Sequence, residues 1–137
     1  MAGFSLGGLI AGIGNIYTGV TTFKAAQRTA DDIEYQGLLA MKEAFRDASI
    51  TREEGRNFAA TQSLQFIGAG VELVGSALIT IAQTTKYADT EARATESQGR
   101  AKATLAERQA DVKRSEGRAA LVGSIFNAGA SFLTAGV

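Results

Sequence analysis

Charged and uncharged positions separate into long blocks along this chain. Every charged residue except Glu72 lies in one of two blocks of equal length, Lys24–Arg56 and Lys86–Arg118. The stretches before, between and after these blocks are apolar or uncharged and polar. Within each block, apolar and small residues recur at spacings of three and four, which is the spacing of one helix face. The chain has no Pro, so nothing in it forbids very long helices. The pattern predicts an all-α chain.

We expect one helical domain, 1–137, because a chain of this length allows a single modest core. Its predicted parts are an apolar Gly-rich segment at 1–23, a first long helix at 24–67, a turn at 68–76, a second long helix at 77–118 and an apolar tail at 119–137. The turn is placed by Gly68, Gly70 and Gly75, since clustered glycines favour a break between helices.

Small residues form one stripe along the second predicted helix, and many of them repeat every eleven residues. The stripe consists of Ala88, Ala92, Thr95, Gly99, Ala103, Ala106, Ala110 and Gly117. An eleven-residue repeat keeps the same face of a nearly straight helix against its partner. Because the side chains are small, the partner helix must come close. We expect a long antiparallel helical hairpin with close Ala/Gly packing, in an oligomeric bundle. An intramolecular hairpin and an intermolecular bundle both satisfy the stripe.

The two ends of the chain are candidates for insertion into a membrane. The stretch Met1–Phe23 has no charge, but it carries six glycines and several polar residues, so it is a weak span. Glycines spaced by four, as in Gly3-xxx-Gly7, suit close helix packing inside or outside a membrane. The candidate insertion residues are Leu6, Leu9, Ile10, Ile13, Ile16, Ile125, Phe126, Phe132 and Leu133.

Composition excludes several kinds of chemistry. There is no His or Cys to act as a base, a nucleophile or a soft metal ligand. The adjacent carboxylates Asp31/Asp32 and Glu53/Glu54 point in different directions on a helix, so we interpret them as solvated surface. We therefore expect no enzyme activity, no cofactor and no metal.

Charge sets a limit on contact with nucleic acid. The 14 basic and 14 acidic residues cancel, whereas a dedicated nucleic-acid binder is basic overall. The second block has a slight basic excess, which allows at most non-specific contact with DNA passing nearby. A solvated or inter-helix salt-bridged face is the simpler interpretation of these mixed charges.

Four motifs follow one another along the chain. They are Glu53-Glu-Gly-Arg56, the turn Gly70-Val-Glu-Leu-Val-Gly-Ser-Ala-Leu78, the helix with Arg93, Gln98-Gly-Arg100 and Arg108-Gln-Ala110, and the tail Gly117-Arg-Ala-Ala-Leu-Val-Gly-Ser124. In this order they resemble the small internal virion proteins of tailed, chiefly short-tailed, bacteriophages. The resemblance covers nearly the whole chain.

This resemblance implies a DNA-ejection or inner-core protein. Such proteins are packaged in the virion near the portal or tail, leave it at infection, and help build a conduit for the genome through the host envelope. The implied partners are further copies of the chain, other virion proteins (portal, tail or other ejection proteins) and the host membrane. A holin-like protein that makes membrane lesions, or a tail or portal lumen component that never meets lipid, are the alternatives.

Overall fold

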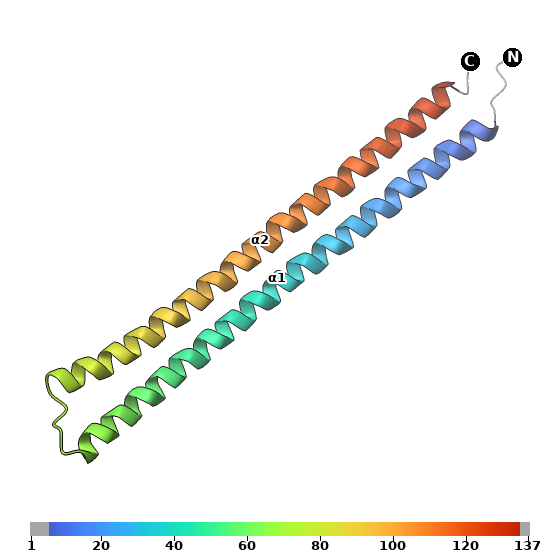
Figure 1. The fold of residues 1–137 in the computed structure, drawn as a ribbon. Helices are drawn as coiled ribbons and strands as arrows, with labels where there is room; N and C mark the ends of the chain where they lie inside the picture. The colour runs from blue at the N-terminus through green and yellow to red at the C-terminus, as the bar shows by residue number, and fades with distance from the viewer. Residues whose placement is uncertain (1–5, 135–137) are drawn as a thin grey trace. The chain divides into compact units, whose positions relative to one another are not determined.

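The chain folds as two long helices joined by a short turn (Figure 1). The computed structural model describes the backbone of residues 6–134 and the side chains of residues 13–130. Helix α1 covers Leu6–Gly68 and helix α2 covers Ser76–Thr134. Within the described residues the chain forms no strand. The prediction of an all-α chain with two long helices packed against each other is confirmed.

Both helices extend beyond the charged blocks. The sequence pattern set the segments 1–23 and 119–137 apart from the long helices, whereas α1 begins at Leu6 and α2 continues to Thr134. The first five and last three residues of these segments lie outside the described part of the chain. Threonine hydroxyls in α1 donate to backbone carbonyls one turn earlier, so these polar residues are satisfied inside the helix. The apolar ends therefore continue the helices rather than form separate segments.

A left-handed glycine ends α1. Gly70 has a φ of 73°, and its N–H donates to the carbonyl of Ile67 at 3.0 Å. The N–H of Val71 donates to the carbonyl of Phe66 at 2.9 Å. These are the two hydrogen bonds of a Schellman motif, which satisfies carbonyls that a helix end leaves without partners. The backbone at position 70 therefore favours glycine, because other residues rarely adopt this positive φ.

A second left-handed glycine immediately precedes α2. Gly75 has a φ of 60°, and its carbonyl accepts a hydrogen bond from the N–H of Ile79 at 3.1 Å. Of the residues in the predicted turn, Gly68 is the last of α1 and Ser76 is the first of α2. The connection between the helices is thus the segment 69–75.

The chain packs as two compact units. The terminal unit comprises Met1–Gln36 and Leu105–Val137, of which 6–36 and 105–134 are described. The turn unit comprises Gly37–Thr104. In each unit a segment of α1 packs along an antiparallel segment of α2. We call this line of contact the seam.

Alanine makes up the buried core of both units. Among the described side chains, every buried hydrophobic residue is an alanine, namely Ala30, Ala110 and Ala128 in the terminal unit and Ala48, Ala59, Ala77 and Ala92 in the turn unit. In α1, the buried positions Gly37, Ala48 and Ala59 are eleven residues apart. Eleven residues complete three turns at 3.67 residues per turn, which returns the chain to the same face. The seam is therefore narrow and lined by small side chains.

The two turn-region glycines Gly68 and Gly70 provide a matched test of this backbone. A Cβ added to either one meets no atom within 4 Å, but only Gly70 has a positive φ. We expect Gly70→Ala to lower the free energy of unfolding by about 1–2 kcal/mol, because an L residue is strained there. Gly68→Ala is expected to raise it by up to about 1 kcal/mol, because alanine favours the helix. Urea unfolding followed by circular dichroism measures both, and equal effects would contradict the assignment.

Candidate interaction surfaces

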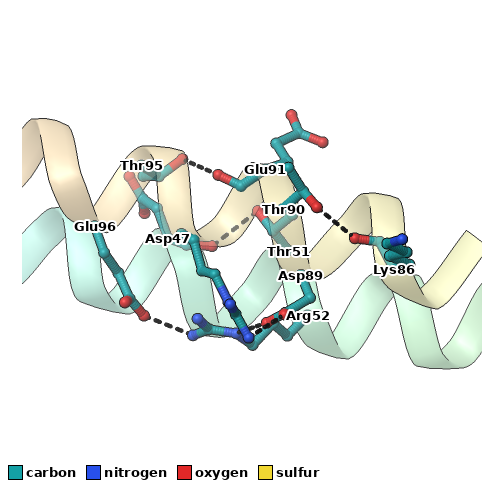
Figure 2. A network of polar contacts seen from close by, with 10 residues as sticks. Asp47, Thr51, Arg52, Lys86, Asp89, Thr90, Glu91, Thr95 and Glu96 are labelled. Carbon is teal, nitrogen blue, oxygen red and sulfur yellow. Dashed lines mark hydrogen bonds and ion pairs between the residues drawn. The ribbon is translucent and has the colours of Figure 1, made fainter.

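An arginine of α1 bridges two carboxylates of α2 in the turn unit (Figure 2). The Nε of Arg52 donates to Oδ1 of Asp89 at 3.1 Å, and its Nη1 donates to Oε1 of Glu96 at 2.6 Å. Arg93, one turn further along α2, also contacts Asp89, at 2.8 Å. The side chains of Arg52 and Glu96 are only 28% and 18% exposed. Arg52 therefore lies along the edge of the seam rather than in open solvent.

These contacts shift the proton affinities of the paired groups. The hydrogen bond from Arg52 holds the pKa of Asp89 below its ordinary value, with help from the nearby charge of Arg93. The hydrogen bond to Glu96, followed by that to Asp89, raises the pKa of Arg52. Both shifts favour the charged forms of the partners. The cluster is thus an ion pair at neutral pH.

The terminal unit contains a second cluster, with the helices exchanged. Here Arg114 of α2 donates from Nη1 and Nη2 to the two carboxylate oxygens of Glu34 at 2.7 and 2.8 Å. Its Nη2 also donates to Oδ1 of Asp31 at 3.0 Å. The hydrogen bond from Arg114 lowers the pKa of Glu34, and the same bond is the main cause that raises the pKa of Arg114. A paired, planar contact of this kind fixes orientation as well as distance.

Glycines on one helix face small residues, chiefly alanines, on the other. In the turn unit, a Cβ added to Gly55 would overlap the Cβ of Ala88, and one added to Gly99 would overlap the Cβ of Ala44. In the terminal unit, a Cβ on Gly117 would lie 2.7 Å from that of Ala26, and one on Gly19 would overlap Ser124. These positions have no room for a methyl group, so they determine how closely the helices approach.

The two clusters are copies of each other in the sequence. A shift of 62 positions aligns the block Lys24–Arg56 with Lys86–Arg118, and 13 of the 33 aligned pairs are identical. The identical residues of the first block are Lys24, Ala26, Ala30, Glu34, Gln36, Gly37, Ala44, Arg46, Ala48, Arg52, Glu54, Gly55 and Arg56. They include the arginine and glutamate of each ion pair and the glycine and alanine of a close contact. The hairpin is built from a duplicated segment.

One ion pair and one close contact follow the duplication. Arg52 with Glu96 in the turn unit corresponds to Arg114 with Glu34 in the terminal unit. Likewise, Gly55 against Ala88 corresponds to Gly117 against Ala26. The second carboxylate is not duplicated: the counterpart of Asp89 is Gln27, and that of Asp31 is Arg93.

Sequence reasoning did not identify the residues of either cluster. It noted that the two blocks are equally long and interpreted their charges as a solvated or inter-helix salt-bridged face, without naming any pair. Comparing the chain with itself at a fixed shift would have found the repeat. It could not have shown which carboxylates each arginine contacts, since the partners are 37 to 83 residues apart.

The predicted small-residue stripe lies along the seam. Ala92, Gly99, Ala110 and Gly117 are buried. The remaining members, Ala88, Thr95, Ala103 and Ala106, are half-buried. The stripe crosses both units. Its α1 counterparts in the duplication include the buried Ala30, Gly37 and Ala48.

The candidate insertion residues occupy the outer part of the terminal unit. Ile13 is 57% exposed, Ile16 is 40% exposed, Ile125 is 53% exposed and Phe126 is 74% exposed. The side chains of Leu6, Leu9, Ile10, Phe132 and Leu133 lie outside those described. Over the part of the chain that the structure describes, neither helix has a stretch long and apolar enough to cross a membrane.

Large apolar side chains are exposed on both helices and in both units. Tyr17 and Phe126 of the terminal unit are 72% and 74% exposed, and Leu64 and Tyr87 of the turn unit are 70% and 74% exposed. The narrow seam leaves no space for them. Comparison with family models, with curated proteins and with solved structures found no match.

The close packing of α1 against α2 is tested by one substitution at the seam and one outside it. Gly99→Leu would force side-chain atoms into Ala44 and the backbone of Met41. We expect it to lower the free energy of unfolding by about 3 kcal/mol, because overpacking separates the helices. Gly123→Leu is the control, since an added Cβ there meets nothing within 4 Å. Chemical denaturation compares the two. An equal response at both positions would contradict close packing at Gly99.

Acid should remove the contribution of the two clusters. The folded-state pKa values of Glu34 and Asp89 are lowered, so their stabilisation is fully present above the ordinary pKa range of carboxylates, about 4. It is lost as the pH falls through the lower, folded-state values. Glu34→Gln/Asp89→Asn should therefore flatten the dependence of unfolding free energy on pH between about 5 and 2. The control, Asp32→Asn/Glu53→Gln, lies outside both clusters and should keep the wild-type slope.

Proposed function

We propose that the chain is a structural protein of a tailed-bacteriophage virion. In this proposal it is packaged near the portal or tail, is ejected at infection, and joins further copies in a helical conduit that carries the genome across the host envelope. The observation that carries the proposal is that the seam buries alanines while most of the large apolar side chains remain exposed. A hairpin of this kind gains most of its apolar burial by assembling with others.

The distribution of apolar side chains supports an assembly along the length of the hairpin. In the turn unit, the exposed set consists of Leu38, Leu39, Phe45, Ile50, Phe58, Leu64, Ile67, Val71, Val74, Leu78, Ile79 and Tyr87. In the terminal unit, it consists of Ile13, Ile16, Tyr17, Tyr35, Leu105, Val112, Val122, Ile125 and Phe126. Neither helix presents these residues in a single place. A bundle of several hairpins covers more of them than a pair does.

Charge supports a conduit that DNA passes through without being held. The chain carries no net charge, and the arginines at the seam are committed to carboxylates of the same chain. Arg52 and Arg114 each contact at least two acidic side chains. Phosphate binding depends on free cationic groups. The proposed contact with DNA is therefore non-specific and weak.

The first experiment asks whether the chain assembles and acts on lipid. Purified protein is sedimented with and without dye-loaded vesicles of phosphatidylethanolamine and phosphatidylglycerol, and its mass is measured in parallel. We expect an oligomer that sediments with the vesicles and releases the dye. An oligomer that leaves them sealed would instead identify a tail or portal lumen component.

Two equally exposed aromatics make a matched pair of variants. Phe126 near the end of α2 and Tyr87 near its start are both 74% exposed. Phe126→Ser should reduce dye release at least fivefold, because the apolar ends are the proposed membrane contact, whereas Tyr87→Ser should leave release within twofold of wild type. Mass spectrometry of purified particles made from the encoding genome completes the test. Absence of the chain from the particles would refute the virion role and favour a holin-like protein.

A further inference from the structure

Helix α1 carries both partners of each kind of contact that it makes with α2: the arginine and the glutamate, and the glycine and the alanine. It carries Arg52 and also Glu34, the residue that the counterpart of Arg52 contacts in the terminal unit. It carries Gly55 and also Ala26, against which the counterpart of Gly55 packs. It also has Ala44, which packs against Gly99, and Gly37, the counterpart of Gly99. No other helix is needed to complete the set.

We propose that the seam of α1 binds the seam of α1 from a second copy of this chain, antiparallel and in the register of the hairpin. Arg52 of each copy would contact Glu34 of the other, and Gly55 would lie against Ala26. Gly37 would lie against Ala44. Each contact occurs twice, because an antiparallel pair of identical helices has two-fold symmetry.

Charge complementarity selects α1 rather than α2 for this pairing. In the terminal unit, the arginine contacts Asp31 as well as Glu34. Both carboxylates belong to α1, so each Arg52 in an α1 pair would meet two carboxylates and no second arginine. In an α2 pair, Arg114 would meet Glu96 and Asp89, as Arg52 does in the turn unit. Arg93 would also lie there, at the position that Asp31 occupies in the terminal unit. The arginine of an α1 pair therefore faces one positive charge fewer than the arginine of an α2 pair.

The turn provides the route to this second arrangement. The hairpin opens if the segment 69–75 extends, and Gly70 and Gly75 are the positions with a positive φ. Glycine adopts extended and left-handed backbone with similar ease. Opening two hairpins breaks two seams and forms one α1 seam, which leaves the seam faces of two α2 helices uncovered. The exchange is therefore favoured in an assembly of several copies, where the α2 faces also find partners. It would occur in this chain whether or not the chain belongs to a virion.

Two charge-swapped variants of the full chain separate the hairpin from the α1 pair. Arg52→Glu/Glu96→Arg restores the ion pair inside the hairpin but sets a glutamate against Glu34 of a second copy. Arg52→Glu/Glu34→Arg restores the pair between copies but sets like charges together inside the hairpin. Both variants exchange the same residue types and leave the net charge unchanged. A difference between them therefore reports pairing rather than composition.

The chain contains no Cys, so single labels and cross-links can be placed cleanly. Thr61→Cys and Gln83→Cys are exposed positions on opposite helices of the turn unit. Labelled chains are diluted into unlabelled chains so that only the distance within one chain is measured. We expect the Glu96 swap to keep a short distance. The Glu34 swap should lose it and at least double the mass in sedimentation equilibrium.

A cross-link tests the proposal without relying on the stability of a swapped chain. Met41 is half-buried and lies next to the centre of the proposed α1 pair. Met41→Cys in an otherwise unchanged chain should give cross-linked dimers with a short bismaleimide reagent, at least fivefold more than its α2 counterpart Ala103→Cys. Adding the Glu96 swap should abolish this dimer. Equal cross-linking at both positions, or cross-linking that the Glu96 swap leaves intact, would overturn the proposal.

These outcomes are distinct from failure of the proposed function. A chain that forms oligomers and sediments with vesicles equally well in both swapped backgrounds, with no Met41→Cys dimer, assembles through its outer faces alone. In that case the virion role stands and α1 pairing is wrong. A chain that is absent from particles but gives the Met41→Cys dimer supports α1 pairing and refutes the virion role.

Discussion

The close approach of α1 and α2 is the constraint on which the other features depend. Helices pack with their axes about 8–10 Å apart, and the smaller values need small side chains at the contact. Here the contact consists of glycine facing alanine, as at Gly99 and Ala44. Alanine itself buries little apolar area, so the gain comes from many contacts repeated along the seam and from the dispersion energy of tight packing. The arginine clusters at Arg52 and Arg114 add direction to a contact that would otherwise slide.

A narrow seam has a consequence for the rest of the surface. Residues such as Leu64 and Phe126 cannot enter a line of contact built for methyl groups, and they remain exposed. In a chain of this size, a larger core would normally bury them. The chain thus buries little apolar surface internally and leaves the outer faces of two long helices exposed. The self-assembly that we propose would cover these faces, and the proposed conduit is one form of it.

Much of the fold follows from local sequence signals, whereas the clusters do not. The absence of Pro and the stripe through Ala92, Gly99 and Ala110 predict long helices with a small-residue face, and the glycines around residue 70 predict the turn. The ends of the helices were harder to predict. Glycines in an uncharged stretch such as 1–23 suggest that a helix stops, but they do not distinguish a helix end from a helix that continues through them. The contact of Arg114 with Glu34 joins residues 80 apart. Only the register of the hairpin brings them together, and periodicity alone does not set a register.

The choice between a hairpin and an intermolecular bundle was open from the stripe alone, and the duplication explains why. Glu34 and Arg52 of α1 have the same spacing as Glu96 and Arg114 of α2. Helix α1 can therefore make the same ion pair with α2 and with α1 of a second copy. The hairpin is favoured by the short connection, because a seven-residue loop keeps α2 at a high effective concentration near α1. That advantage is entropic, and it decreases as copies are crowded together. In the α1 pairing that we propose, a confined assembly favours the exchange, because it supplies both a second copy of α1 and further partners for α2.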